Sequence, residues 1–391
     1  MIISFSKFGA GGGGGGTTDY NQLQNKPKIN GVELKNDKNS HSDLGIIDVE
    51  RISESLYDRL RVKDSNRLYI IEEDYDGCTR IVNLSNEVMT VEKIEHGSEF
   101  EGSIMYSFDP DEGESGWSDF SSIQVPAHGV VYLGGNGYVP SNDDNYCSIR
   151  ANKPHKVEGI LESVHAFYDF RGDVGLNEYQ FYGLFEDDEY LVDASGLILY
   201  EYGDIEPYAY SHLFAGCTSL KYAPKKKACM IYSHSMDYMF AYCSSLEYMY
   251  EFELGACDGG EGGFAFMFIG CTSLKETPKI YIPYMTSVGL FESTFAYCTS
   301  LERFEMMGDE VYQDPIDLSQ EEKVVFNMLD GCSSLKYVKV NFTNIDYSLR
   351  PTENWMRGVP STGTFVTPSD TNWVTGSNGI PAGWTREDLE I

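Results

Sequence analysis

The sequence has no long apolar run. None of its 391 residues lies in a stretch of about 18 consecutive apolar residues, which is what a transmembrane helix needs, so we expect no insertion into a membrane. The opening segment, residues 1–8, has too short an apolar core for a secretory signal, and six glycines follow it at 11–16. These features disfavour a secreted bacterial protein.

Basic residues are also scarce. The chain has 29 Lys and Arg against 61 Asp and Glu, and its formal net charge of −32 repels nucleic acid and anionic membrane surfaces. We therefore expect no nucleic-acid partner. Aromatic residues, by contrast, exceed what an ordinary core needs, with 28 Tyr and 21 Phe. They either fill the core of repeated units, which is the simpler interpretation, or form a recognition surface, for which Tyr is well suited.

The short motifs that accompany catalysis or metal binding are missing too. The chain has no Gly-x-Ser-x-Gly, no His-Glu-x-x-His, no dinucleotide-binding fingerprint and no Cys-x-x-Cys pair. Its 7 histidines are scattered, and none stands at metal-ligand spacing with a partner. Carboxylates are so frequent that a glycosidase pair cannot be recognised by spacing. We predict no catalytic residue, no metal site and no cofactor, and hence a protein that is not an enzyme.

What the chain does have is a seven-residue phrase, Phe-x-x-Cys-x-Ser-Leu, repeated through its C-terminal half. Successive copies begin between 26 and 34 residues apart, and a period in this range is typical of stacked solenoids, which are mostly binding surfaces. In the first copy Asp188 replaces Cys, as expected for a terminal unit whose outer face meets water or the preceding domain. The copies occupy residues 185–191, 214–220, 240–246, 268–274, 295–301 and 329–335.

Each copy predicts a short helix, a tight turn and then a strand. An apolar residue lies four positions before the phrase, and with the Phe and Cys positions it gives the spacing i, i+4, i+7 of one helix face. A short extended run follows the closing Leu, for example at 336–342. We therefore predict an α/β solenoid over 176–350, with neighbouring strands paired sideways and helices on the other side.

The Cys of the phrase recurs at one position of the stack, so we expect buried free thiols rather than disulfides or metal ligands. This cysteine usage fits assembly in a reducing cytoplasm. The predicted repeat-core residues are Phe214, Cys217, Leu220, Phe240, Cys243, Leu246, Phe268, Cys271, Leu274, Phe295, Cys298, Leu301, Cys332 and Leu335.

The first 60 residues carry only weak structural signals. An Asn-Gly pair at 30–31 predicts a two-residue β-hairpin, and such a piece cannot form its own core, so it should dock on another chain or another copy. Residues 47–60 predict a short helix with one apolar stripe, which either packs on the next domain or associates with its own copies in a small bundle. The stripe consists of Val49, Ile52, Leu56 and Leu60.

Residues 61–175 predict an all-β, sandwich-like domain, because short strand-like runs alternate there with turn signals. Residues 351–391 are dense in turns and hold three of the 4 tryptophans, which suits a cap over the last repeat, although stacking on sugars is an alternative for these rings. The strand-like runs are 68–71, 79–83, 88–91, 102–108, 122–125 and 129–133, and the tryptophans are Trp355, Trp373 and Trp384.

The repeated phrase at this period resembles BspA-like leucine-rich repeats, which occur in bacterial surface adhesins and in some phage proteins. Residues 20–34 with 43–46 look like the virion-proximal element of phage head or tail fibres. The segments 105–109, 125–129, 132–136, 362–366 and 379–385 resemble fibre proteins of phages, including crAss-like ones, that infect gut Bacteroides-type bacteria. In this order the resemblance covers nearly the whole chain, and its departures from the repeat are mild, with Asp188 for Cys in the first copy and Leu329 for Phe in the last.

The resemblance implies a structural bacteriophage fibre protein that is assembled in the host cytoplasm and located in the virion. Residues 1–46 would anchor it to capsid or tail proteins, and the repeats would adhere to a glycan or protein of the host surface. Fibres of this kind are commonly trimers, so a homotrimer is expected, with Val49, Ile52 and Leu56 as oligomerisation residues. The expected virion-anchor residues are Ile2, Ile3, Phe5, Phe8, Tyr20, Leu23, Pro27 and Ile29.

Two other functions fit parts of the sequence. A bacterial cell-surface adhesin with the same repeat is the first alternative, and a secretion leader or a cell-wall anchor would favour it. A polysaccharide depolymerase is the second, and it would need a cluster of catalytic carboxylates on the repeats.

Overall fold

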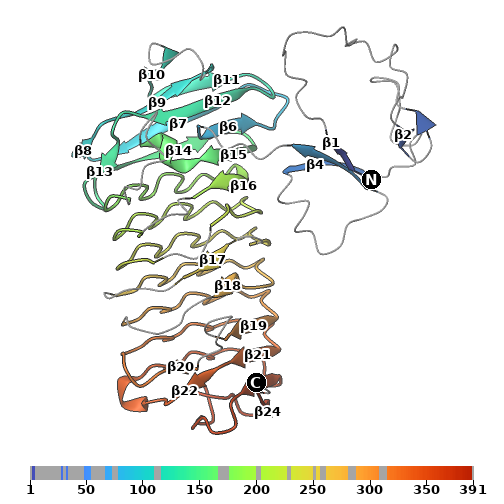
Figure 1. Ribbon diagram of the computed structural model, residues 1–391, viewed down its shortest axis with the longest axis vertical. Coiled ribbons are helices and arrows are strands. Elements are labelled where there is room, and N and C mark those ends of the chain that lie inside the picture. Colours follow the sequence, from blue (N-terminus) through green and yellow to red (C-terminus); the bar gives the residue numbers. More distant parts are fainter. Residues whose placement is uncertain are drawn as a thin grey trace, which may run out of the picture. The chain divides into compact units, whose positions relative to one another are not determined.

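The computed structural model divides the chain into two compact units, Met1–Tyr75 and Asp76–Ile391. The described residues are rich in β-strands and contain no α-helix, only the short 3-10 helices η4 (Leu161–Val164) and η5 (Tyr347–Leu349) (Figure 1). The expected β-rich, multidomain fold is confirmed at this level. The structure describes residues 78–109, 116–165, 176–199, 204–226, 230–249, 252–255, 261–280, 288–307 and 315–389, and the backbone of five strands before residue 78.

In the first unit, β5 (Arg67–Glu72) lies between β1 (Ile2–Ser4) and β4 (Asp48–Ser53), and both neighbours pair with it in parallel. The hairpin predicted at 30–31 is confirmed, because β2 (Lys28–Ile29) and β3 (Val32–Glu33) pair antiparallel. The strand-like run expected at 68–71 is β5 and belongs to this unit rather than to the following β-domain.

The helix predicted over 47–60 is wrong for residues 48–53. Val49 and Ile52 lie in β4, where each residue from Asp48 to Ser53 pairs with one of β5. A short isolated helix is marginal in water, whereas the parallel ladder satisfies backbone groups along the whole segment, and β-branched Val and Ile favour it. Leu56 and Leu60 lie outside the described residues.

Two sheets form the β-domain at the start of the second unit (Figure 1). Their buried side chains belong to one core. The runs expected near 79–83, 88–91, 102–108, 122–125 and 129–133 are all strands. In order, the first sheet consists of β10 (Ser118–Asp119), β9 (Ile104–Ser107), β12 (Val130–Gly135), β6 (Arg80–Asn83), β15 (His155–Ile160) and β16 (Leu191–Ile198). The second consists of β11 (Ser122–Val125), β7 (Met89–His96) and β14 (Tyr146–Ala151), and β8 (Phe100–Glu101) pairs with β13 (Val139–Pro140).

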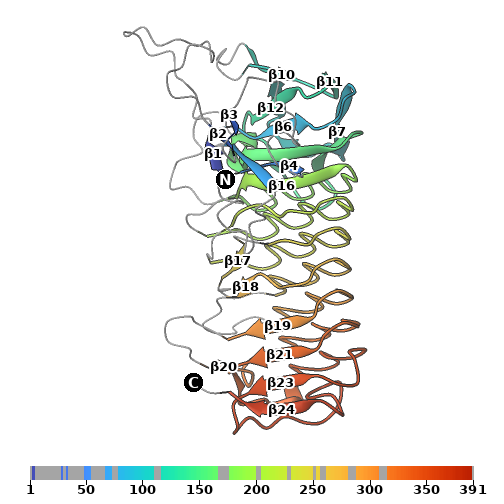
Figure 2. The same cartoon turned by 90° about the vertical axis from the view of Figure 1, so that its right-hand side faces the viewer.

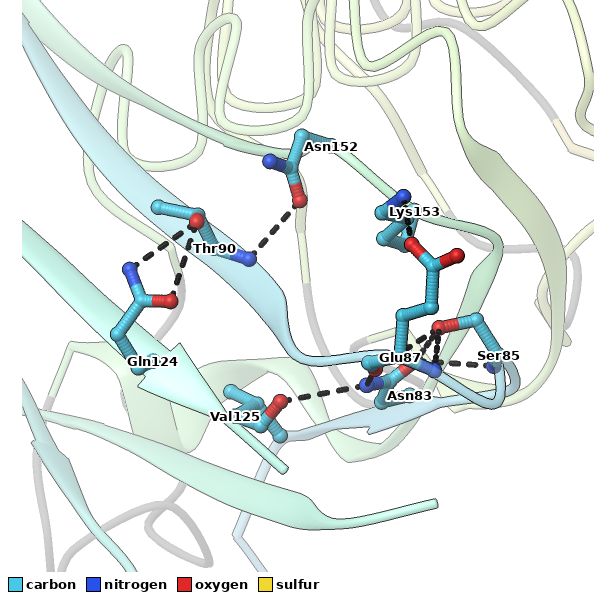
Figure 3. A network of polar contacts seen from close by, with 8 residues as sticks. All are labelled: Asn83, Ser85, Glu87, Thr90, Gln124, Val125, Asn152 and Lys153. Carbon is cyan, nitrogen blue, oxygen red and sulfur yellow. Dashed lines mark hydrogen bonds and ion pairs between the residues drawn. The ribbon is translucent and has the colours of Figure 1, made fainter. Parts of the chain in front are cut away.

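A polar network ties together the loops at one end of this domain (Figure 3). Its centre is the buried side chain of Asn83, whose amide nitrogen donates to the carbonyls of Glu87 (2.8 Å), Val125 (3.2 Å) and Pro126 (2.9 Å). The Asn83 side-chain oxygen accepts hydrogen bonds from the backbone N–H and the hydroxyl of Ser85. The Asn83 amide thus provides hydrogen-bond partners for backbone groups of two separate loops. Such partners are needed because an unpaired polar group away from water costs free energy.

Beyond β16, the chain forms layers that lie one beneath another, and one wall of the layers is a series of parallel strands (Figure 2). The sideways pairing expected between neighbouring units is confirmed. The strands are paired as β17 (Glu253–Leu254) with β18 (Lys279–Ile280), β20 (Ile316–Asp317) with β22 (Phe342–Thr343), and β19 (Arg303–Met306), β21 (Tyr337–Val340), β23 (Thr364–Thr367) and β24 (Thr385–Asp388) in sequence.

The opposite wall is made of consecutive tight turns, so the helix predicted for each unit is wrong. In these runs, N–H groups alternate between two kinds of acceptor: Ala215 N–H bonds to the His212 carbonyl within its own layer, whereas Phe214 N–H bonds to Met239 of the next layer. A helix would direct every N–H along its own axis. Because these turns repeat every four residues, they produce the same i, i+4 spacing of apolar residues that a helix face has.

Every fourth residue of a turn run has φ between +52° and +78°, which no α-helix tolerates. Three such positions occur in each layer, and the pattern continues to a seventh layer at 350–358, which extends into the segment 351–391 that was expected to form the cap. Layer by layer, the positions are Tyr179, Gly183, Asp187; Tyr208, His212, Gly216; His234, Tyr238, Tyr242; Gly262, Phe266, Gly270; Gly289, Ser293, Tyr297; Lys323, Asn327, Gly331; and Arg350, Asn354, Gly358.

The core between the two walls is also periodic. All of the predicted repeat-core residues are buried. The phenyl rings stack from layer to layer at 5.3–5.5 Å between centroids, starting with Phe185 on Phe214. Each phrase Cys is a free thiol that donates to the carbonyl of the Phe one layer above, as Cys217 does to Phe185 at 3.0 Å.

Candidate binding surface

The left-handed positions of the turn runs form three outward columns, which we call the turn face. Most residues between them point inward, as in layer 3, where Met239 and Phe240 are buried while Tyr238 and Tyr242 reach the surface. The turn face is therefore one surface that the repeat presents, and the predicted repeat-core residues lie behind it.

The first two columns carry a ladder of stacked rings. In the first column, Tyr179 stacks on Tyr208 at 4.6 Å and Tyr208 on His234 at 5.1 Å. In the second, His212 stacks on Tyr238 at 4.9 Å and Tyr238 on Phe266 at 4.7 Å. Because each ring covers the face of its neighbour, these ladders expose ring edges and hydroxyl groups.

Carboxylates stand beside these rings. Glu186 accepts hydrogen bonds from the Tyr146 hydroxyl (2.6 Å) and lies 3.1 Å from His212 Nδ1. Burial alone would raise the pKa of Glu186, but its hydrogen bonds with His212 and Tyr146 lower it below the usual range. The hydrogen bond between Asp237 and His234 raises the pKa of His234. The ladders are therefore aromatic and acidic, and their negative charge has the same sign as the net charge of the whole chain.

The third column differs, because glycine and tyrosine alternate along it. Layers 2 to 6 carry Gly216, Tyr242, Gly270, Tyr297 and Gly331. Both tyrosines are exposed, and each ring lies against the glycine of the next layer.

Two polar columns flank the third column. The residue after each Cys is Ser or Thr, and in three layers its hydroxyl donates to a carbonyl of the layer above: Ser244 to Thr218, Thr272 to Ser244 at 3.3 Å, and Thr299 to Thr272. The residue after each closing Leu alternates in charge, and Glu247 pairs with Lys275 at 3.2 Å and with Lys221 at 3.8 Å. Glu302 and Lys336 continue the alternation and pair at 3.3 Å.

The tryptophans of the C-terminal segment do not belong to this surface. Trp355 and Trp384 are buried, Trp373 is half-buried, and Trp355 stacks on Trp373 at 5.3 Å. Their indole N–H groups donate to Gly379, Pro360 and Thr367, respectively. Trp355 belongs to the turn run of layer 7, and these contacts leave the buried rings no free face for a sugar.

No three His, Cys, Asp or Glu side chains among the described residues are grouped closely enough to hold a metal ion. No helix in the described part of the chain is long and apolar enough to cross a membrane. Of the predicted anchor residues, Ile2 and Ile3 lie in β1 and Ile29 in β2. The others, Phe5, Phe8, Tyr20, Leu23 and Pro27, lie outside the described residues.

Sequence reasoning missed the turn face, although a signal was present. The repeated phrase reads Phe-Ala-Gly-Cys or Phe-Ile-Gly-Cys in some copies and Phe-Ala-Tyr-Cys in others, and Gly alternates with Tyr. Glycine inside a predicted helix is costly, so its recurrence before Cys argues for a left-handed backbone. The chain matches no protein-family model, no curated protein and no solved structure.

Proposed function

We propose that residues 176–358 are a leucine-rich-repeat solenoid of the BspA type, and that this solenoid is the adhesive part of a structural phage virion fibre protein. The observation that carries the proposal is the turn face, where partly exposed aromatic side chains stand at left-handed positions that folding alone would give to glycine. Large side chains held there at a cost in folding free energy are explained by recognition of a partner.

The layered backbone supports adhesion as the mechanism. Both walls of each layer are hydrogen-bonded to the neighbouring layers, so the turn face is held at a fixed spacing and loses little entropy on binding. The N-terminal unit would attach the protein to capsid or tail proteins, most simply as a homotrimer. Several copies on one particle would then multiply weak single contacts with a glycan or protein of the host surface.

Two experiments test this function. Antibodies against residues 76–391 should label fibres on intact phage particles, and the purified chain should compete with those particles for adsorption to gut Bacteroides-type bacteria. Deletion of residues 1–46 should abolish incorporation into particles and leave the second unit folded. Recovery of the protein from bacterial envelopes, with none on particles, would instead favour the bacterial surface adhesin.

A further inference from the structure

The two tyrosines of the third column are poorly explained by folding. Tyr242 and Tyr297 both have φ of +62°, where a side chain costs about 1–2 kcal/mol relative to glycine. Burial does not offset this cost, because the two residues are 58% and 51% exposed. The equivalent positions in layers 2, 4 and 6 hold glycine, which adopts this backbone conformation without strain.

The intervening glycines give these rings their position. A Cβ atom on Gly270 would lie 2.8 Å from Cδ1 of Tyr242, and one on Gly331 would lie 2.6 Å from Cδ1 of Tyr297. Each tyrosine ring therefore packs on the glycine backbone of the next layer. It does not stack on another ring, whereas Tyr208 stacks on His234. The alternation of Gly and Tyr keeps the outer side of each ring open to solvent.

The spacing of the rings fits a linear ligand. Neighbouring layers are hydrogen-bonded like adjacent strands, which lie about 4.8 Å apart, so rings two layers apart are separated by about 10 Å. This is close to the length of two linked pyranose rings. The faces of pyranose rings that carry C–H bonds pack well on an open aromatic ring.

The flanking columns favour a neutral, hydroxyl-rich ligand. Hydroxyl groups of Ser244, Thr272 and Thr299 run beside the rings, and the Lys and Glu side chains beyond them alternate in sign. This strip offers both donors and acceptors with little local net charge, and the −32 charge of the chain repels polyanions. The backbone N–H groups of the turn runs are already bonded within or between layers, so they offer little for strand addition by a peptide.

We propose that Tyr242 and Tyr297 are two stacking subsites for a neutral linear polysaccharide that lies along the third column. This inference rests on the proposed adhesive function and names the ligand class of that surface. Binding would bury one open ring at each subsite, while the hydroxyl and charged columns hydrogen-bond the sugar hydroxyls.

The test measures binding of the full chain to xylan, glucomannan and mixed-linkage β-glucan by affinity electrophoresis. Tyr242→Gly and Tyr297→Gly place in each layer the residue that its neighbours already have and relieve the cost of a side chain at φ +62°, so both variants should fold with melting temperatures at or above that of the wild type. We expect each single variant to weaken binding at least tenfold, and the double variant to bind no polysaccharide detectably. Tyr190→Ala, which removes an exposed tyrosine outside the three columns, should bind like the wild type.

Three results would overturn the proposal: no binding of wild type to any neutral polysaccharide, undiminished binding by the folded double variant, or preference for alginate or a proline-rich peptide. Adsorption to bacterial cells separates this inference from the function on which it rests. If the double variant still competes with phage for cells, the glycan subsites are wrong and adhesion stands. If the wild type does not compete, the adhesive function itself fails.

Discussion

At the scale of single residues, the cysteines contribute packing and one weak hydrogen bond each. Five thiols lie in the interior, each 3.0–3.2 Å from a carbonyl of the layer above. Burial raises the pKa of each of these thiols, that of Cys332 to about 12. A thiol held neutral in this way is a poor nucleophile and a poor metal ligand, which argues for a structural role.

The raised thiol pKa values predict a loss of stability in alkali. An unfolded thiol ionises near its usual pKa of about 8.5, so above that pH the unfolded state releases protons first, and stability falls as pH rises toward the folded pKa. Cys271→Ser keeps a hydroxyl donor for the Phe240 carbonyl but does not ionise there. The slope of unfolding free energy between about pH 9.5 and about pH 11 should become shallower by about 1.4 kcal/mol per pH unit. Urea unfolding at several pH values measures it.

Exposed Ser333 provides the control for this experiment, because Ser333→Ala removes a surface hydroxyl and no ionising group. Its pH slope should equal that of the wild type. An unchanged slope in Cys271→Ser would mean that this thiol already ionises in the folded protein.

The hydrogen bonds of Asn83 predict that replacing this one buried amide lowers the stability of the protein strongly. Asn83→Asp replaces the nitrogen that donates to three carbonyls with an acceptor, so we expect a loss of about 2–4 kcal/mol in unfolding free energy. Neighbouring Asn86 has an exposed contact with His128, so Asn86→Asp should change stability by less than about 0.5 kcal/mol. Chemical denaturation of both variants decides the matter, and equal stabilities would contradict the role given to Asn83.

At the scale of elements, the turn run shows why a correct periodicity led to a wrong secondary structure. Apolar residues at i, i+4 and i+7 face the core in a helix, and they do so equally in turns that repeat every four residues. The pattern identified the buried residues, such as Phe214 and Cys217, without distinguishing between the two backbones. Only the conformation at Gly216 and its equivalents, and the direction of the N–H groups, separates them.

The close approach of Tyr242 to Gly270 predicts a coupled pair. Gly270→Ala combines strain at φ +74° with a clash against the ring, and should cost about 2–3 kcal/mol. Gly137→Ala is the matched control, because its φ is +68° and nothing lies within 4 Å of the added Cβ, so it should cost only about 1 kcal/mol.

A double-mutant cycle separates strain from clash. In the Tyr242→Gly background, the cost of Gly270→Ala should fall to that of Gly137→Ala, a coupling of about 1–2 kcal/mol in urea unfolding. Strict additivity would show that the ring moves aside freely, and would weaken the case for a fixed stacking subsite.

At the scale of the whole molecule, sequence reasoning performed best where a short local pattern determines the structure. Alternating strands such as β11, the hairpin between β2 and β3, and the layered repeat were all predictable from residue spacing. It failed where a distant partner decides the outcome. Residues 48–53 look like a helix until β5 is available, and the long-range pairing of β15 with β16 has no local signal.

The junction between the β-domain and layer 1 illustrates such a distant constraint. In layers 2 to 6, Cys donates its S–H group to a carbonyl of the layer above. Layer 1 instead lies beside β14 and β15, where the backbone N–H of Ala151 needs an acceptor. Asp188 supplies it: its Oδ2 lies 3.1 Å from both Ala151 N and His155 Nε2, and Oδ1 accepts from Tyr190 N–H at 3.2 Å. Asp188 therefore departs from the repeated phrase because its carboxylate joins layer 1 to the β-domain.

Asp188→Cys, which restores the repeated phrase, should therefore destabilise the protein. A thiol donor would face the Ala151 N–H and leave it buried without an acceptor, at a cost of about 1–3 kcal/mol at this junction. Because the junction couples the β-domain to the layers, wild-type residues 76–391 should unfold in one transition, and the variant in two. Differential scanning calorimetry of residues 76–391 would then show two heat-absorption peaks instead of one. The same substitution at the exposed neighbour, Asp187→Cys, serves as the control. A single transition in Asp188→Cys would show that the layers and the β-domain are coupled elsewhere.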